Sequence, residues 1–285
     1  MRRMRCIFCR QPSDTSRSIE HVIPESLGNH SRVLAAGGVC DACNNYFSRK
    51  VEAPFLNASW TRMLRHEQGV ASKRGRVPTM RAIAPGLGEA TMHAPTYTDP
   101  RFVAFDTPSE SHRWLLSRSR NVLLTDEVIS PPSQTTTSRF IAKVAIEFLA
   151  SRLEHVPGGL DYLVDETNLD RLRDHARRGS DPLWPVSVRR LYSANARWRE
   201  NGAHVQRVWE ADFFQDDEDS QYVIIVIFGV EFAIHLGEPD ISGYRRWLLL
   251  NHGRSPLYSG RYATQLNDRD GTFDRCHLTI IGSSA

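Results

Sequence analysis

No stretch of the sequence is apolar for long enough to cross a bilayer. The longest apolar run, Tyr222 to Ile234, is well short of the roughly 20 residues that a spanning helix needs, and Gly229 and Glu231 interrupt it. The N-terminus, Met-Arg-Arg-Met-Arg, has no apolar stretch behind it that would form a secretory signal. These absences predict a cytoplasmic protein without a membrane partner, in which thiols stay reduced.

Cysteine is scarce as well, with five residues in a chain of 285. Four of them form two Cys-x-x-Cys pairs, Cys6 with Cys9 and Cys40 with Cys43. In a reducing compartment this duplicated spacing predicts a metal site rather than disulfides. Each pair places its two sulfurs within about 4 Å, so one zinc ion can join all four thiolates in a closed tetrahedral shell. Such an ion holds the fold and leaves no position for water, so we expect the zinc to be structural.

Positive charge is concentrated near the N-terminus. Residues 1–76 contain 13 Arg and Lys against 6 Asp and Glu, a net charge of +7. The remainder contains 23 against 27, a net charge of −4, so the two parts sum to the +3 of the whole chain. A basic segment beside a mildly acidic remainder favours contact with a polyanion, although a solvated basic face has the same composition.

The length and the ordinary apolar fraction predict a globular protein that buries one hydrophobic core or two. We expect an α+β fold in two parts. Residues 1–76 form an N-terminal unit that contains the cysteine pairs, and residues 79–285 form a C-terminal α+β domain that selects the substrate or regulates the N-terminal unit. The boundary is placed in the segment from Gln68 to Pro78, which is rich in Gly, Ser, Lys and Arg.

Regular spacing of apolar residues predicts several helices and strands. Behind the second cysteine pair, Phe47, Val51 and Phe55 recur at helical spacing, and Pro54 kinks or ends this helix before a second one through Trp60 to Arg65. An apolar stripe after Ser138 predicts an amphipathic helix. The basic segment 169–178 predicts a shorter helix that ends at Gly179. Alternating or continuous apolar residues predict strands over 101–105, 114–124, 222–228 and 230–236, the last two joined near Gly229.

Two further motifs accompany the cysteine pairs. Residues 18–28, between the pairs, read Ser-Ile-Glu-His-Val-Ile-Pro-Glu-Ser-Leu-Gly, and residues 44–48, directly after the last cysteine, read Asn-Asn-Tyr-Phe-Ser. This arrangement closely resembles the HNH endonucleases, and within them the subgroup in which two Cys-x-x-Cys pairs bracket the motif. The resemblance covers roughly residues 3–56. It implies a zinc-bound ββα-metal unit and an enzyme that hydrolyses phosphodiester bonds, with double-stranded DNA as the expected substrate.

The residues that match the family motif have chemistry suited to this reaction. A neutral histidine can take a proton from water near pH 7, so His21 is assigned as the general base. Glu20 offers a carboxylate oxygen and Asn44 an amide oxygen to one catalytic Mg²⁺ or Mn²⁺ ion, which stabilises charge at the scissile phosphate. Neighbouring residues of an ideal strand point to opposite faces, so Glu20 and His21 share one site only if the strand twists or breaks there.

One position departs from the family pattern. Many HNH enzymes have a middle asparagine that braces the loop through hydrogen bonds to the backbone, where this sequence has Ala35, Ala36 and Gly37. Asn29 or His30 can brace the loop from an earlier position. Alternatively, a tight backbone around the glycine needs no brace.

Three more polar residues are candidates for a supporting role. Asn45 and Glu52 are seven residues apart and share a face of the predicted helix. Together with His30, they either orient His21 or the cysteine site from behind, or belong to a solvated polar surface.

A nonenzymatic zinc-ribbon protein that binds nucleic acid is the alternative to a nuclease. Two cysteine pairs and a basic surface suffice for such a protein, whereas it does not require Glu20, His21 and Asn44. Analogy with the family also suggests a role in defence against foreign DNA.

Overall fold

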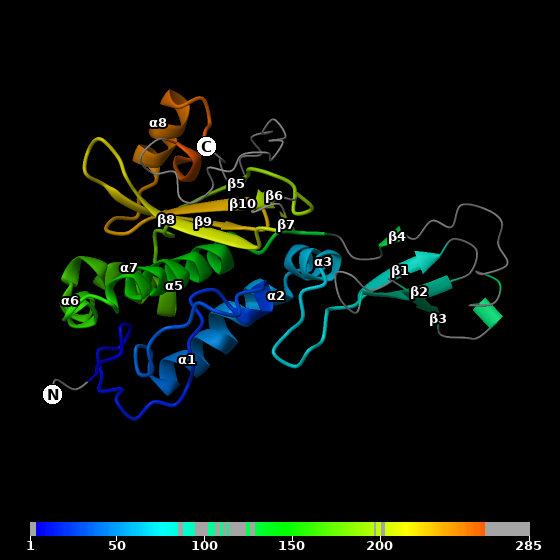
Figure 1. The fold of residues 1–285 in the computed structure, drawn as a ribbon, viewed down its shortest axis with the longest axis horizontal. Coiled ribbons are helices and arrows are strands. Elements are labelled where there is room, and N and C mark those ends of the chain that lie inside the picture. The colour runs from blue at the N-terminus through cyan, green and yellow to red at the C-terminus, as the bar shows by residue number, and fades with distance from the viewer. Residues whose placement is uncertain are drawn as a thin grey trace. The chain divides into compact units, whose positions relative to one another are not determined.

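The computed structural model describes residues 4–84, 88–94, 102–105, 109–110, 113, 124–125, 129–196, 198–200 and 203–259. Helices and strands are both present, which confirms the predicted α+β class (Figure 1). The chain divides into two compact units. The first unit comprises residues 1–24, 29–53 and 133–285, and the second comprises residues 25–28 and 54–132.

The helices behind the second cysteine pair lie where the apolar spacing predicts them. They are α1 (Asp41–Phe47), the π-helical η2 (Ser48–Glu52), α2 (Ala53–Asn57) and α3 (Ser59–Glu67), and the short 3₁₀ turn η1 (Glu25–Leu27) precedes them. Phe47, Val51 and Phe55 are buried, as their spacing predicts. Pro54 has no N–H to donate to the carbonyl of Lys50, and the irregular η2 turn stands directly before it.

The first unit contains an antiparallel sheet with the strand order β5-β10-β9-β8. Its strands are β5 (Val186–Arg190), β8 (Trp209–Gln215), β9 (Gln221–Ile227) and β10 (Val230–His235), and β6 (Trp198–Glu200) pairs with β7 (Ala203–Val205) in a separate ribbon. The predicted pair of buried strands is confirmed as the hairpin β9–β10. Phe228 and Gly229 form its turn with φ angles of 46° and 79°, and a Cβ at Gly229 would lie 2.1 Å from the carbonyl oxygen of Tyr192.

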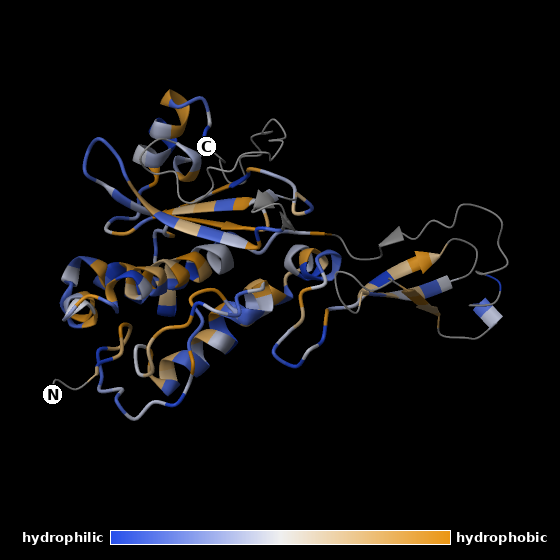
Figure 2. Cartoon of the chain, in the orientation of Figure 1, coloured by the Kyte–Doolittle hydropathy of each residue, from blue (hydrophilic) through white to orange (hydrophobic). Residues whose placement is uncertain are grey.

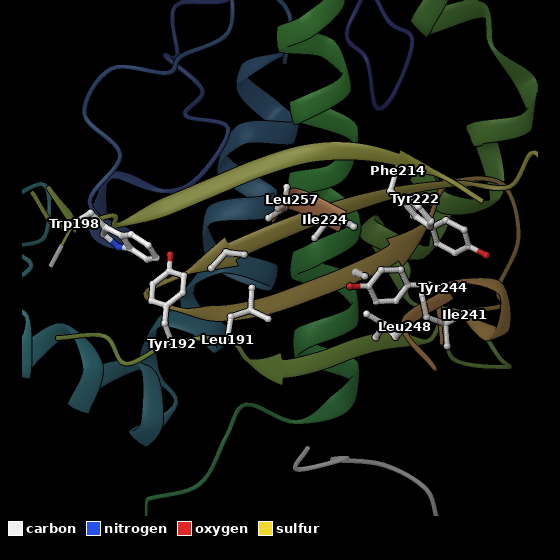
Figure 3. Close-up of a cluster of buried hydrophobic side chains, with 12 residues drawn as sticks. Leu191, Tyr192, Trp198, Phe214, Tyr222, Ile224, Ile241, Tyr244, Leu248 and Leu257 are labelled. Carbon is white, nitrogen blue, oxygen red and sulfur yellow. The ribbon is translucent and has the colours of Figure 1, made fainter. Parts of the chain in front are cut away.

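Helices cover both faces of this sheet (Figure 1). On one face α5 (Gln134–Leu153) packs against β5 and β10, and the ring of Phe148 lies 5.0 Å from that of Phe213. Helices α6 (Gly159–Asp165) and α7 (Asp170–Arg178) pack on α5, with η3 (Thr167–Leu169) between them. On the other face, α8 (Ser242–Leu250) and η4 (Pro256–Tyr258) enclose a cluster rich in aromatic rings, including Phe214, Tyr222 and Tyr244 (Figure 3).

Helix α5 departs from its predicted form. It begins at Gln134, because the side chain of Ser133 accepts a hydrogen bond from the backbone N–H of Thr136 and caps the helix before Ser138. It is also buried nearly all round, because η2 and α7 pack on it in addition to the sheet. The predicted basic helix, by contrast, is α7, which ends at Gly179 as expected.

The second unit contains the antiparallel order β3-β2-β1-β4. Its strands are β1 (Met80–Ala84), β2 (Gly88–His93), β3 (Phe102–Phe105) and β4 (Leu124–Thr125), and α3 packs against β1. Strand β3 confirms the prediction over 101–105 except at residue 101, which lies outside the described residues. Of the predicted strand 114–124, the described residues include only Leu124. Across the described part of the chain, no helix is long and apolar enough to cross a membrane.

This division into units differs from the boundary expected at residues 77–78. The cysteine-bearing segment shares a unit with the second half of the chain because polar contacts join them. Arg5 pairs with Asp165 at 2.7 Å, and Arg173, which is buried on α7, donates to the carbonyl oxygen of Ile7 at 2.8 Å. Composition indicates a basic loop at residues 68–78, but this loop lies inside the second unit and not between the two units.

Candidate active site

The four paired cysteines come together, as their spacing predicts. Cys6 and Cys9 lie on a turn closed by a hydrogen bond from the N–H of Arg10 to the carbonyl of Cys6, and Cys40 and Cys43 lie at the N-terminus of α1. All four Sγ atoms are within 4.8 Å of one another, and those of Cys9 and Cys40 are 3.6 Å apart. Four sulfurs at these separations fit a closed tetrahedral metal shell.

Mutual repulsion opposes the joint ionisation of the four sulfurs. A hydrogen bond to Cys6, burial and the charges of the other sulfurs raise the pKa of the Cys43 thiol well above its usual value. Burial raises the pKa of Cys9 to about 11, whereas the hydrogen bond from Cys43 lowers that of Cys6 to about 5. Four thiolates therefore cannot all ionise together unless a bound cation neutralises them.

A short hairpin carries the His-containing motif. The N–H of Leu34 donates to the carbonyl of Glu20 at 2.9 Å, and His21 forms a bridge with Val33. Asn29 braces the loop between the two arms and is only 1% exposed. Its Nδ2 donates to the carbonyls of Ile23 and Arg32, both at 2.8 Å, and its Oδ1 accepts from the N–H groups of Ser31 and Arg32 at 3.3 and 2.9 Å. Of the two candidates for the brace, the structure selects Asn29, and His30 beside it is exposed.

His21 and Asn44 lie at the edges of this hairpin. The ring of His21 is half-buried, and its Nδ1 atom is buried without a hydrogen-bond partner among the described residues. Asn44, on α1, donates from Nδ2 to the carbonyl of Ile19 at 3.3 Å, which ties the helix to the residue before Glu20. Asn45 is exposed on the same helix, and its carbonyl accepts from Nε of Arg49.

Glu20 points into the interior and meets a lysine from α5. The ammonium of Lys143 donates a hydrogen bond to Oε1 of Glu20 at 2.6 Å. The same nitrogen lies 2.6 Å from a carboxylate oxygen of Glu52 and 2.8 Å from one of Glu147. The side chains of Lys143 and Glu147 are 0% exposed, and that of Glu20 is 7% exposed. We call these four residues the Lys143 cluster.

The charges of the Lys143 cluster are strongly coupled. Burial lowers the pKa of Lys143, but the charges of Glu147, Glu20 and Glu52 outweigh it and raise that pKa well above its usual value. Burial, together with the charge of Glu20, raises the pKa of Glu147 well above the usual range of a carboxylic acid. The lysine therefore stays charged, and burial favours the protonated form of Glu147.

Sequence reasoning identified Glu20 and Glu52 but missed Lys143 and Glu147. The available signal was the pair of opposite charges four residues apart inside the otherwise apolar stretch from Ile141 to Phe148. A lysine and a glutamate at that spacing are usually solvated on a helix surface. Here the apolar residues on either side of them show that both faces of α5 are covered.

We expect Asn29→Ala to lower the free energy of unfolding by about 2 kcal/mol or more, because it leaves buried carbonyl and N–H groups without partners. Chemical denaturation of the variant measures this loss. Asn45→Ala is the matched control, since that asparagine is exposed, and it should stay within about 0.5 kcal/mol of the wild type. Equal stabilities for the two variants would contradict the bracing role.

Lys143→Met should lower the free energy of unfolding by more than Asn29→Ala does. It leaves the carboxylates of Glu20, Glu52 and Glu147 without a counter-ion. Removal of one partner from a buried ion pair typically costs about 3–5 kcal/mol. The double variant Lys143→Met with Glu147→Leu replaces a cation and an acid by apolar groups, so it should recover much of the loss. Denaturation curves of both variants test this, and a single variant as stable as the wild type would contradict the burial of the charges.

Comparison with known proteins gives one finding that bears on this site. Residues 6–59 match the family model described as HNH endonuclease. Comparison with curated proteins and with solved structures gives no match. The matched residues contain the four cysteines, the hairpin braced by Asn29 and helix α1, so this segment of the chain is similar to the HNH endonucleases.

Proposed function

We propose that this protein is a metal-dependent HNH endonuclease that hydrolyses phosphodiester bonds in DNA. The arrangement of the hairpin against α1 supports this function best. The hydrogen bond from Asn44 to the carbonyl of Ile19 holds the helix next to the Glu20–His21 pair, and the four cysteines hold the start of the same helix. This contact supports a shared role for Asn44 and the Glu20–His21 pair, although His21 and Asn44 are 23 positions apart in the sequence.

His21 would act as the general base. Its ring is half-buried, so it is accessible from solvent while the hairpin limits its movement. The neutral imidazole accepts a proton from the attacking water, and the resulting hydroxide attacks phosphorus and displaces the leaving oxygen. The orphaned Nδ1 indicates that a further group, such as a water molecule or the substrate, completes the surroundings of this ring.

Glu20 and Asn44 would hold the catalytic Mg²⁺ or Mn²⁺ ion. Both offer the hard oxygen atoms that these ions prefer. The Nδ2 atom of Asn44 is engaged with the backbone, so its amide oxygen is the atom left to bind a cation. When bound, the ion supplies positive charge that stabilises the scissile phosphate and the leaving oxygen. Asn45, Glu52 and His30 would act as supporting residues, and Glu52 lies at ion-pair distance from Lys143.

The four cysteines would hold a structural zinc ion, which joins the turn at Cys6 to the start of α1. A closed shell of four thiolates has no open position for water or substrate, so its contribution is to folding.

A nonenzymatic zinc-ribbon protein that binds nucleic acid is the second candidate. One observation is compatible with it: Oε1 of Glu20 is engaged by Lys143, so only the second oxygen of this carboxylate is left for a catalytic ion. The two candidates differ in what His21 does, so cleavage by a His21 variant separates them. A role in defence against foreign DNA rests on analogy with the family.

We expect His21→Ala to reduce cleavage of plasmid DNA in the presence of Mg²⁺ on the order of 100-fold or more, the usual effect of removing a general base. The same assay is repeated with an RNA substrate and without Mg²⁺. His155→Ala is the matched control, because the side chain of His155 is 84% exposed. Wild-type cleavage by the His21 variant, with zinc content and circular dichroism unchanged, would exclude the HNH mechanism. Binding of DNA without cleavage by the wild-type protein would favour the nonenzymatic binding protein.

Freshly purified protein should contain one zinc ion per chain, measured by plasma mass spectrometry. Cys43→Ser should lose this ion and unfold the N-terminal segment, because a three-thiolate shell binds zinc less tightly and the fold depends on the metal. Cys276→Ser is the control, since this cysteine lies outside both pairs in the sequence. Folded protein free of zinc would contradict the structural metal.

DNA binding should depend on an exposed basic turn at residues 72–76. Backbone hydrogen bonds between Ser72 and both Gly75 and Arg76 close this turn, which presents Lys73, Arg74 and Arg76 to solvent. No carboxylate pairs with these three cations in the described part of the chain. The tip of this loop, between α3 and β1, is hydrophilic in Figure 2. Unpaired cations on a fixed turn suit contact with phosphates.

Replacing Lys73, Arg74 and Arg76 with glutamine should lower the slope of log affinity against log salt by about 2 to 3 on duplex DNA, at about 0.9 per phosphate contact. Titrations of labelled duplex at several salt concentrations measure the slope.

The control removes the same net charge from arginines that already have carboxylate partners, namely Arg171 with Glu238, Arg178 with Asp174, and Arg246 with Glu218. An equal drop in slope in both triple variants would mean that overall charge, and not the turn, governs binding.

A further inference from the structure

We propose that Lys143 is a positioning residue of the nuclease, which holds the carboxylate of Glu20 from outside the HNH segment. The active site would then be complete only when α5 packs against the hairpin. This inference rests on the proposed function, because it assigns Lys143 through the role of Glu20 as a ligand of the catalytic ion. It concerns a residue 84 positions beyond the end of the family match at residue 59.

The ammonium of Lys143 makes short contacts with three carboxylates, and one of them is that of Glu20. The ammonium donates a hydrogen bond to Oε1 of Glu20 at 2.6 Å. The same nitrogen lies 2.6 Å from Oε1 of Glu52 and 2.8 Å from Oε2 of Glu147. Of these three carboxylates, that of Glu20 belongs to the residue directly before His21, so its contact with Lys143 bears on the proposed metal site.

The position of Glu20 makes that bond consequential. Glu20 directly precedes His21, and its backbone carbonyl receives the N–H of Leu34 across the hairpin. The backbone of this residue is thus fixed by the hairpin and its carboxylate by Lys143. A carboxylate with one oxygen fixed has few orientations left, so its second oxygen is presented in a defined direction. Hydrogen-bonded partners of metal ligands act in this way in metalloenzymes generally.

The placement of lysine along the chain supports a specific role. The sequence has 33 arginines and only three lysines, Lys50, Lys73 and Lys143. The first two are exposed, and Lys143 is fully buried. A compact ammonium presents three donors on a flexible stem and can sit among three carboxylates, whereas a planar guanidinium would need more room.

The test separates positioning from simple stabilisation by keeping the charge balanced. In Lys143→Met with Glu147→Leu, one cation and one acid are removed together, so the cluster keeps Glu20 and Glu52 without a stranded third carboxylate. The Mn²⁺ affinity of the full-length protein is measured from the free Mn²⁺ signal in electron paramagnetic resonance. We expect it to fall about 10- to 100-fold, the usual effect of removing a partner of a metal ligand.

Kinetics give a second readout on the same variant. The kcat for DNA cleavage should fall, while the KM for DNA stays near that of the wild type because the phosphate contacts lie elsewhere. Lys143→Arg combined with Glu147→Ala restores a donor and vacates space for it, so it should recover part of both the Mn²⁺ affinity and kcat. Lys50→Met is the control for loss of an exposed lysine and should leave Mn²⁺ affinity unchanged.

Glu20→Gln distinguishes failure of this inference from failure of the proposed function. If Glu20→Gln binds Mn²⁺ and cleaves as the wild type does, Glu20 is not a ligand, and both the metal assignment and the inference fall. If Glu20→Gln loses both properties and the balanced double variant keeps wild-type Mn²⁺ affinity and kcat, Lys143 only stabilises the fold. Loss of both properties in Glu20→Gln, with weakened Mn²⁺ binding in a folded double variant, supports the positioning role.

Discussion

An ammonium group withdrawn from water must be matched by negative charge, because burial costs each ion several kcal/mol of hydration. Lys143 meets this constraint with three glutamates, of which Glu20 and Glu52 belong to the HNH segment. Helix α5 cannot separate from that segment without stranding charge on both sides. Because α5 also packs on the sheet of the second half, one buried cation joins the nuclease motif to the remaining core of its unit.

The features that could be predicted from the sequence are those encoded within a few residues. Two Cys-x-x-Cys turns, the helix behind Cys43 and the β9–β10 hairpin each follow from local spacing or from the turn at Gly229, and the structure confirms all three. The brace of the loop could be predicted for the same reason, because an asparagine side chain can form hydrogen bonds with the backbone of its own loop. The sequence left Asn29, His30 or a tight glycine backbone as alternatives, and the burial and hydrogen bonds of Asn29 identify it as the brace.

The remaining features depend on contacts between distant parts of the chain. Lys143 is 123 positions from Glu20, and no local pattern links them. Helix α5 has charged residues on the side opposite its apolar stripe, which in a two-layer arrangement would face water. A third layer, made of η2 and α7, packs on α5. The charged residues that would otherwise face water are therefore buried in the Lys143 cluster. The division into units could not be predicted for the same reason, because composition indicates a loop but not which segments pack together.

Tertiary contacts also reduce the number of cations in the N-terminal segment that are available to bind a ligand. Counting residues assigns +7 to positions 1–76, but Arg5 and Arg10 pair with aspartates of the second half, and Arg65 is buried. These three of the 13 cations are therefore part of the fold and do not face a ligand. The exposed turn at residues 72–76 keeps its cations, and it lies beyond the family match. On the proposed function, the HNH segment supplies the reacting groups, while a lysine and a basic turn outside it supply their orientation and the hold on DNA.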